Sequence, residues 1–211
     1  MLMPFVKVSI LVVQLDVQDE IEKRDIENQN GHNPHDQLSE VESAKIIIDH
    51  VKEGVELAKK YRLPKILIDF ITTHHGTTRT EYFYRNFLKN NPDIPVVLSD
   101  FCYPGPKPTT KEQTILLLAD SVEAASKSLK NPKLQEISDL VDNIISYTIT
   151  HEQLTESDLT FEELESCRSV FKQLLKFNFY DRDNKNILLS YINGLKPITE
   201  KNWFLEKVNE K

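Results

Sequence analysis

Apolar residues recur three or four positions apart from Ser39 to about Phe177, which is the spacing of one helix face. The clearest such stripe follows Ser39 and consists of Ala44, Ile47, Ile48, Val51, Val55 and Ala58. The pattern predicts further helices after residues 64, 82, 110, 134 and 160, the last one running to about residue 177. The sequence therefore predicts an all-α bundle of helices.

Start signals for helices agree with this pattern. Ser39-Glu40-Val41-Glu42 is a capping box, and Thr110 to Gln113 and Thr160 to Glu163 repeat the arrangement. Leu63-Pro64 predicts a helix with proline at its first position. Gly54, one turn after His50 on the predicted helix face, is expected to leave room beside that histidine.

The two ends of the chain do not share the helical pattern. Val6 to Val17 is rich in β-branched residues that partly alternate with polar ones, which is typical of a strand. After residue 181 the periodicity is weak, and the tail is predicted as a helix on that basis alone. We divide the chain into an atypical N-terminal segment (1–24), a helical domain (25–180) and a divergent C-terminal tail (181–211).

Composition narrows the class of protein. Of 211 residues, 39% are hydrophobic and 28% are charged, so the chain can bury a core, and its net charge of −7 argues against a general binder of polymeric nucleic acid. Two distant cysteines, Cys102 and Cys167, form no disulfide framework and favour a reducing compartment, so we expect a cytoplasmic location. No stretch reaches the roughly 18 apolar residues of a membrane span.

Candidate chemistry lies on three of the predicted helices. His50 is at the edge of the first apolar stripe, and His74-His75 stand at a helix end before Gly76. Asp120 lies inside an apolar helix, where a carboxylate needs a cation or hydrogen-bond donors. Three imidazoles suit a borderline transition metal. The alternatives are histidines that complement a helix dipole and an aspartate bonded to helix N–H groups or a lysine.

Several longer motifs resemble the HD-domain hydrolases, and within them the PgpH family of membrane-associated cyclic di-AMP phosphodiesterases. They extend over about residues 25–180 and comprise Asn33-Pro34-His35-Asp36, the run from Ile47 to Gly54, His74-His75-Gly76-Thr77, Tyr103-Pro104-Gly105-Pro106-Lys107-Pro108 and the run from Leu118 to Ala124. Each motif alone is weak, but their joint order and spacing are specific to that family.

The resemblance implies an all-α HD-domain bundle that holds two transition metals, iron or manganese in preference to zinc. It implies a metal-dependent phosphodiesterase that opens cyclic di-AMP to linear pApA, with a cyclic dinucleotide or another phosphoester as its partner. His50, His74, His75 and Asp120 correspond to metal ligands of the family, and Asp120 is also the predicted catalytic residue. Family members face the cytoplasm from the membrane, although this chain has no predicted membrane span.

The sequence departs from the family at its N-terminal end. The resemblance implies a further histidine and a His-Asp dyad upstream of Asn33, but residues 1–27 contain no histidine. His35-Asp36 has the dyad's letters, yet it matches the separate Asn-Pro-His-Asp segment, so we interpret it as structural. We therefore expect at most one well-held metal and weak or absent hydrolysis. The alternatives are a degenerate domain that binds metal or nucleotide without turnover, and a truncated product with ends altered by a reading-frame error.

Two cations are candidates for binding the substrate. Lys107 lies in the proline-stiffened loop, and Arg79 follows the paired histidines closely. Either side chain could bind a substrate phosphate. The alternative for both residues is an ordinary solvated position in a turn.

Overall fold

The computed structural model describes residues 38–181, and all of its regular elements are helical. They are α3 (Glu40–Lys60), α4 (Lys65–Thr73), α5 (Glu81–Asn90), the 3₁₀ helix η2 (Leu98–Phe101), α6 (Lys111–Ser126), α7 (Leu134–Thr150), α8 (Phe161–Lys176) and the π-helical turn η3 (Phe177–Asp181). The predicted all-α class is confirmed. The predicted strand at residues 6–17 and helix after residue 181 lie outside the described residues, as do most of the limits drawn for the domain and its flanking segments.

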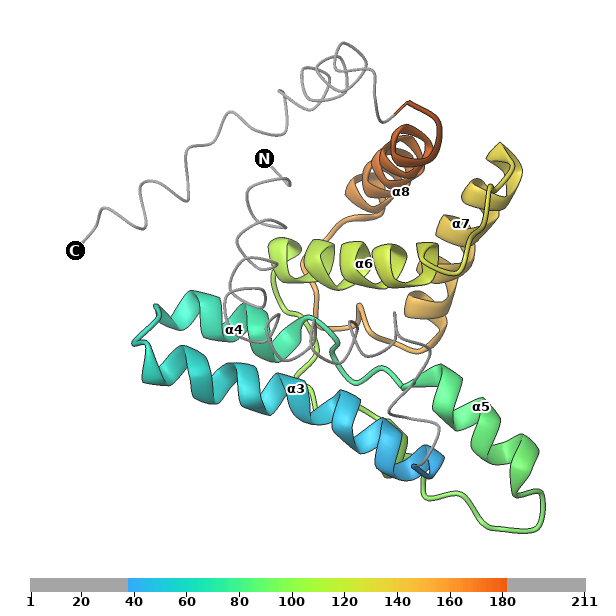
Figure 1. The fold of residues 1–211 in the computed structure, drawn as a ribbon. Helices are drawn as coiled ribbons and strands as arrows, with labels where there is room; N and C mark the ends of the chain where they lie inside the picture. The colour runs from blue at the N-terminus through green and yellow to red at the C-terminus, as the bar shows by residue number, and fades with distance from the viewer. Residues whose placement is uncertain (1–37, 182–211) are drawn as a thin grey trace.

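The described helices form two groups that meet at α6. Helices α3 and α4 pack side by side, and α5 and η2 contact α3. On the other side, α7 and α8 pack against each other and against α6, which also contacts α4 (Figure 1). Because α6 touches both groups, a residue on its α4 side lies next to the segment that follows α4.

The helix starts are those that the capping signals predict. Ser39, Thr110 and Thr160 each accept a hydrogen bond from the backbone N–H three residues on, and the Glu or Gln there bonds back to the cap. Pro64 is one position earlier than expected, because it caps α4 and the helix begins at Lys65. Near the end of α4, the last helical residue is Thr73, so both paired histidines lie just beyond the helix.

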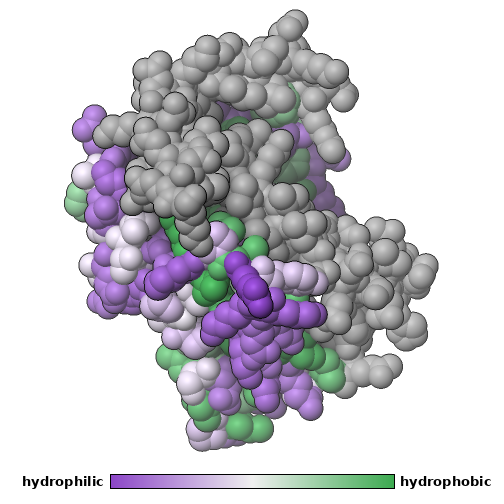
Figure 2. Space-filling model, turned by 90° about the vertical axis from the view of Figure 1, so that its left-hand side faces the viewer, coloured by the Kyte–Doolittle hydropathy of each residue, from purple (hydrophilic) through white to green (hydrophobic). Residues whose placement is uncertain are grey.

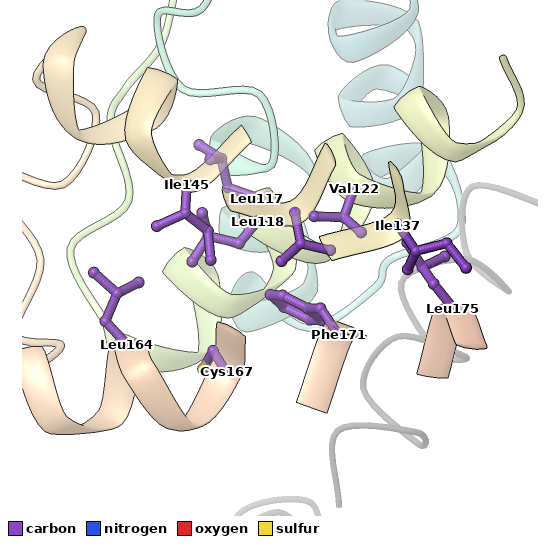
Figure 3. Packing of buried hydrophobic residues seen from close by; sticks show 10 residues of the cluster. Leu117, Leu118, Val122, Ile137, Ile145, Leu164, Cys167, Phe171 and Leu175 are labelled. Atoms are coloured by element: carbon purple, nitrogen blue, oxygen red, sulfur yellow. The ribbon is translucent and has the colours of Figure 1, made fainter. Parts of the chain in front are cut away.

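The main hydrophobic core lies between α6, α7 and α8. Figure 3 shows Leu117, Leu118 and Val122 of α6 facing side chains from the other two helices. The latter include Ile137, Val141 and Ile145 of α7 and Leu164, Cys167, Phe171 and Leu175 of α8. Leu116 on α6 is buried as well, so this helix is covered by protein on several sides. Because α6 is packed in this way, the position of Asp120, on a less buried side of that helix, is fixed relative to the core.

One face of the first group has a mostly polar described surface (Figure 2). Figure 2 shows the side of the molecule where α3 and α4 meet, and the described atoms there are mainly hydrophilic, with smaller hydrophobic areas among them. Within residues 38–181, no helix is both long enough and apolar enough to cross a bilayer.

Candidate metal centre

Three imidazoles from two neighbouring segments converge. His50 comes from the middle of α3, whereas His74 and His75 come directly after α4. One ring nitrogen from each can be chosen so that all three lie within 4.8 Å of one another. The rings of His74 and His75 have centroids 4.0 Å apart, and the His50 ring meets both nearly edge-on. The three histidines that the sequence singled out therefore lie in one cluster.

The hydrogen bonds of two rings determine which nitrogens face each other. Nδ1 of His50 bonds to the carbonyl oxygen of Ile47, and Nδ1 of His74 bonds to that of Ile71 at 2.7 Å. Because a carbonyl only accepts, both Nδ1 atoms carry hydrogen, and each neutral ring presents a bare lone pair at Nε2. These two Nε2 atoms lie 3.2 Å apart. Two lone pairs at that distance repel each other unless a proton or a metal ion lies between them, so the donor set fits a metal ion.

Burial keeps these rings neutral. The pKa of His74 is lowered by burial, and that of His50 is lowered by burial and then by His74. The pKa of His75 falls well below its usual value because of burial, followed by the effects of His74 and His50. Neutral imidazole is the form that binds metals. Near neutral pH the cluster therefore does not have to release a proton before it binds a metal ion.

Asp120 of α6 lies at the edge of the cluster. One of its carboxylate oxygens is 3.5 Å from Nδ1 of His75, and 36% of its side-chain area is exposed. The pKa of Asp120 is raised to about 6 by burial and then by Glu123, against the opposing effects of His50 and Lys127. The structure thus brings all four predicted ligand residues together, three as a tight group and the carboxylate beside them.

Two glycines, Gly54 and Gly76, lie near the cluster, and the role of Gly54 differs from the predicted one. A Cβ on Gly54 would lie 3.1 Å from Cγ2 of Ile71, so the space at Gly54 is filled by α4. The expectation that Gly54 leaves room beside His50 is wrong. Gly76 has φ +53°, a conformation that suits glycine, and turns the chain immediately after His75.

Sequence reasoning missed a buried glutamine that holds this turn. Gln153 follows α7, is 3% exposed, and accepts a hydrogen bond at 2.9 Å from the backbone N–H of Thr77. Its amide nitrogen donates to Oγ1 of Thr77 and to the carbonyl of His151. Because 76 residues separate Gln153 from Thr77, no local pattern could have indicated this contact.

A second missed residue is Tyr103, in the proline-rich loop. Its ring is stacked on the ring of His75, with centroids 4.2 Å apart and planes at 20°. Burial and then the charge of Asp120 raise the pKa of this phenol well above its usual value. The run from Tyr103 to Pro108 is the available signal: it predicts a stiff loop and is one of the motifs of the family resemblance, but neither interpretation assigns a role to the tyrosine ring.

The two cations proposed for substrate binding lie in different surroundings. Lys107 donates one hydrogen bond of 3.3 Å to the hydroxyl of Thr155. Arg79 is paired through two nitrogens with both carboxylate oxygens of Glu81, at 2.7 and 3.0 Å, and its guanidinium lies 3.8 Å over the ring of Tyr84. Lys107 therefore has the more available charge, whereas Arg79 stabilises the start of α5.

The all-α fold, the three neutral imidazoles that converge and the neighbouring carboxylate are together typical of a helical metal-binding domain. Comparison with known families agrees, because the HD domain model matches residues 21–125. Among solved structures, the HD domain of the phosphodiesterase PgpH from Listeria monocytogenes in complex with cyclic di-AMP is 38% identical, with a TM-score of 0.65, and the match covers 70% of this chain and 68% of that one. The chain belongs to the HD-domain family.

Curated relatives agree with the structural match. The cyclic-di-AMP phosphodiesterase PgpH of Bacillus subtilis is 42% identical over 158 residues, and that of Listeria monocytogenes is 39% identical over the same length. Each match covers 74% of this chain but 22% of the relative, so the chain spans about a fifth of the length of these proteins. The resemblance seen in the sequence motifs is confirmed.

Proposed function

We propose that this chain is a metal-dependent phosphodiesterase domain that hydrolyses a cyclic dinucleotide, cyclic di-AMP to linear pApA. The observation that carries the proposal is the 3.2 Å distance between the unprotonated Nε2 atoms of His50 and His74, in a group of three neutral imidazoles. The substrate class is supported by the similarity to PgpH proteins, one of whose HD domains has been solved with cyclic di-AMP.

In this proposal His50, His74 and His75 hold one divalent transition metal, and Asp120 supplies a negative charge beside it. Iron or manganese is proposed in preference to zinc, on the family resemblance. When bound, such a metal acts as a Lewis acid that activates water and polarises a phosphoryl oxygen. On the family resemblance, Asp120 has the further role of a catalytic carboxylate, and its position 3.5 Å from Nδ1 of His75 places it beside the proposed metal ligands.

Lys107 is proposed to bind a phosphate of the substrate. Its loop lies along the turn after His75, since Pro108 is 3.6 Å from the position of a Cβ on Gly76. Its ammonium group has a single hydroxyl partner, Thr155, among the described residues. Arg79 is the weaker of the two cation proposals, because its charge is already balanced by Glu81.

We place the protein in the cytoplasm, where its substrate class would be met. The free thiols of Cys102 and Cys167 accord with a reducing compartment. The net charge of −7 makes polymeric nucleic acid an unsuitable partner.

A second candidate function is binding of metal or nucleotide without turnover. It is favoured by one observation, the lack of any histidine in residues 1–27, where the family resemblance implies a His-Asp dyad. A phosphodiesterase with two metals needs ligands for both ions, and within residues 38–181 the structure offers a good set for one. We therefore expect hydrolysis to be slow.

The test is hydrolysis of cyclic di-AMP by the full chain, purified without a histidine tag and supplied with Mn²⁺ or Fe²⁺. Separation of the nucleotides by chromatography measures the appearance of pApA. Slow turnover that His74→Ala abolishes supports the enzyme. Metal-dependent binding of cyclic di-AMP without any product supports the second candidate. Absence of both binding and product contradicts the two together.

The matched control is His151→Ala. His151 lies at the end of α7 outside the histidine cluster, is exposed, and stacks on Tyr147. Replacing it removes an imidazole without touching the proposed ligands, so activity and binding should stay at the level of the unaltered chain.

A further inference from the structure

The ring of Tyr103 covers one side of the imidazole cluster. It is stacked on His75 at 4.2 Å between centroids, and it meets the ring of His50 nearly edge-on at 5.9 Å. The residue is 8% exposed and comes from the loop between η2 and α6, not from either segment that carries the histidines. A third part of the chain therefore contributes a ring to the cluster.

Backbone hydrogen bonds hold this ring in place relative to His75. The N–H of Tyr103 donates to the carbonyl of Thr78 at 2.9 Å. Thr78 in turn donates twice to the carbonyl of His75, from its backbone N–H at 3.1 Å and from its hydroxyl at 2.7 Å. The loop and the turn after α4 are thus one bonded unit, in which the tyrosine and histidine rings keep a fixed spacing.

His75 differs from the other two histidines in what orients its ring. His50 and His74 each have Nδ1 bonded to the backbone carbonyl three residues earlier in the chain, which fixes the rotation of the ring. The ring of His75 makes no such bond to any residue between 38 and 181, and its Nδ1 is 3.5 Å from Asp120. Its orientation therefore depends on this contact with Asp120 and on the rings packed against it.

We propose that Tyr103 is a positioning residue for His75, and that its ring does for this imidazole what a carbonyl does for each of the others. The inference rests on the proposed metal site, because the orientation of His75 matters if its nitrogen is to join those of His50 and His74 around one ion. Stacking restricts the imidazole to a plane nearly parallel to the phenol ring.

The proposed role needs the ring of Tyr103 but not its hydroxyl, so a substitution that removes the hydroxyl alone separates the two groups. Within the part of the chain that the structure describes, the hydroxyl makes no hydrogen bond. Tyr103→Phe keeps the stacked ring and leaves no protein group without its partner. Tyr103→Leu keeps an apolar side chain but removes the ring.

The experiment titrates the full chain with Co²⁺ alone and follows the visible absorption of the bound ion, which reports both affinity and ligand geometry. Tyr103→Leu is expected to bind Co²⁺ about 10- to 100-fold more weakly, with a changed spectrum, as is usual when the support of a ligand is lost. Tyr103→Phe is expected to retain the affinity and the spectrum. Circular dichroism confirms that each variant is folded, and Tyr103→Met replaces the leucine variant if that one fails to fold.

Phe101→Leu is the control for general loosening of the loop. Phe101 lies two residues earlier and is fully buried, but its ring faces Tyr84 and Phe87 of α5. This variant should be less stable than the unaltered chain and yet bind Co²⁺ equally well. A loss of affinity as large as that of Tyr103→Leu would overturn the specific role of Tyr103.

Failure of the positioning role of Tyr103 and failure of the proposed metal site give different results. If the unaltered chain binds Co²⁺ and Tyr103→Leu binds it within threefold as tightly, the positioning role is overturned and the metal site stands. Equal losses in Tyr103→Phe and Tyr103→Leu also overturn it, because the ring would then not be the element that matters. If the unaltered chain binds no Co²⁺, the proposed metal site itself is overturned, and the inference with it.

Discussion

Gly76→Ala is the substitution that most directly tests how the turn after the paired histidines is held. A Cβ at this position would lie 2.6 Å from Oε1 of Gln153 and 3.2 Å from Cδ1 of Leu117. The backbone there has φ +53°, which an alanine adopts only with strain. The new methyl group would therefore displace the amide of Gln153, which accepts hydrogen bonds from the N–H and the hydroxyl of Thr77.

Two contributions give the expected size of the effect. The left-handed backbone costs alanine about 1–2 kcal/mol, and each of the two hydrogen bonds to Gln153 contributes about 0.5–1.5 kcal/mol. We expect the free energy of unfolding to fall by about 3 kcal/mol. In urea this is a decrease in the midpoint of about 1–3 M. The assay is equilibrium unfolding of the full chain with a chelator present, so that metal binding does not contribute.

A double-mutant cycle separates the two contributions. Gln153→Ala alone should cost about 1–3 kcal/mol, because the N–H of Thr77 loses its acceptor. In that background Gly76→Ala should cost mainly the backbone contribution of about 1–2 kcal/mol, since the amide of Gln153 is no longer there to be displaced. If Gly76→Ala unfolds within about 0.5 kcal/mol of the unaltered chain, or if the two changes are additive, the account of this turn is refuted.

Three further predictions concern charges. The pKa of Glu163 is lowered to about 2, first by its hydrogen bond to Lys111. Its stabilising contribution is therefore present above its unfolded pKa of about 4.3 and is lost as the pH falls toward 2. Because the pair is largely exposed, we expect this contribution to the free energy of unfolding to be about 1 kcal/mol, and Glu163→Gln should show a flatter dependence of unfolding on acid pH. Lys107→Ala should weaken binding of cyclic di-AMP about tenfold in a titration and leave Co²⁺ affinity unchanged, whereas equal nucleotide affinity would remove Lys107 from the site. Arg79→Ala should lower stability in urea by about 1–3 kcal/mol, because Glu81 loses a two-point partner, and an unchanged midpoint would contradict the structural role of that pair.

Local signals in the sequence were sufficient for the helix starts and for most helix limits. The capping boxes at Ser39, Thr110 and Thr160 involve residues three apart, so their hydrogen bonds can be foreseen from the sequence. The limits of α7, Leu134 and Thr150, follow its apolar spacing. Pro64 was misplaced by one residue, because proline suits both the position before a helix and its first turn.

The candidate site was predictable in its residues but not in its geometry. The types and spacing of His50, His74, His75 and Asp120 could be matched to a family, yet the facing Nε2 atoms depend on how α3 packs on α4. The stack of Tyr103 on His75 depends on the path of a loop. Such contacts join distant segments, and residue spacing along the chain carries no information about them.

The metal content of the full chain tests the central claim most directly. After loading with Mn²⁺ and removal of excess ion, elemental analysis gives the number of metal ions per chain, for the unaltered protein, for His74→Ala and for His151→Ala. The account predicts one ion in the unaltered chain and in His151→Ala, and a large loss in His74→Ala. No bound ion in the unaltered chain, equal content in His74→Ala, or two tightly held ions would contradict it.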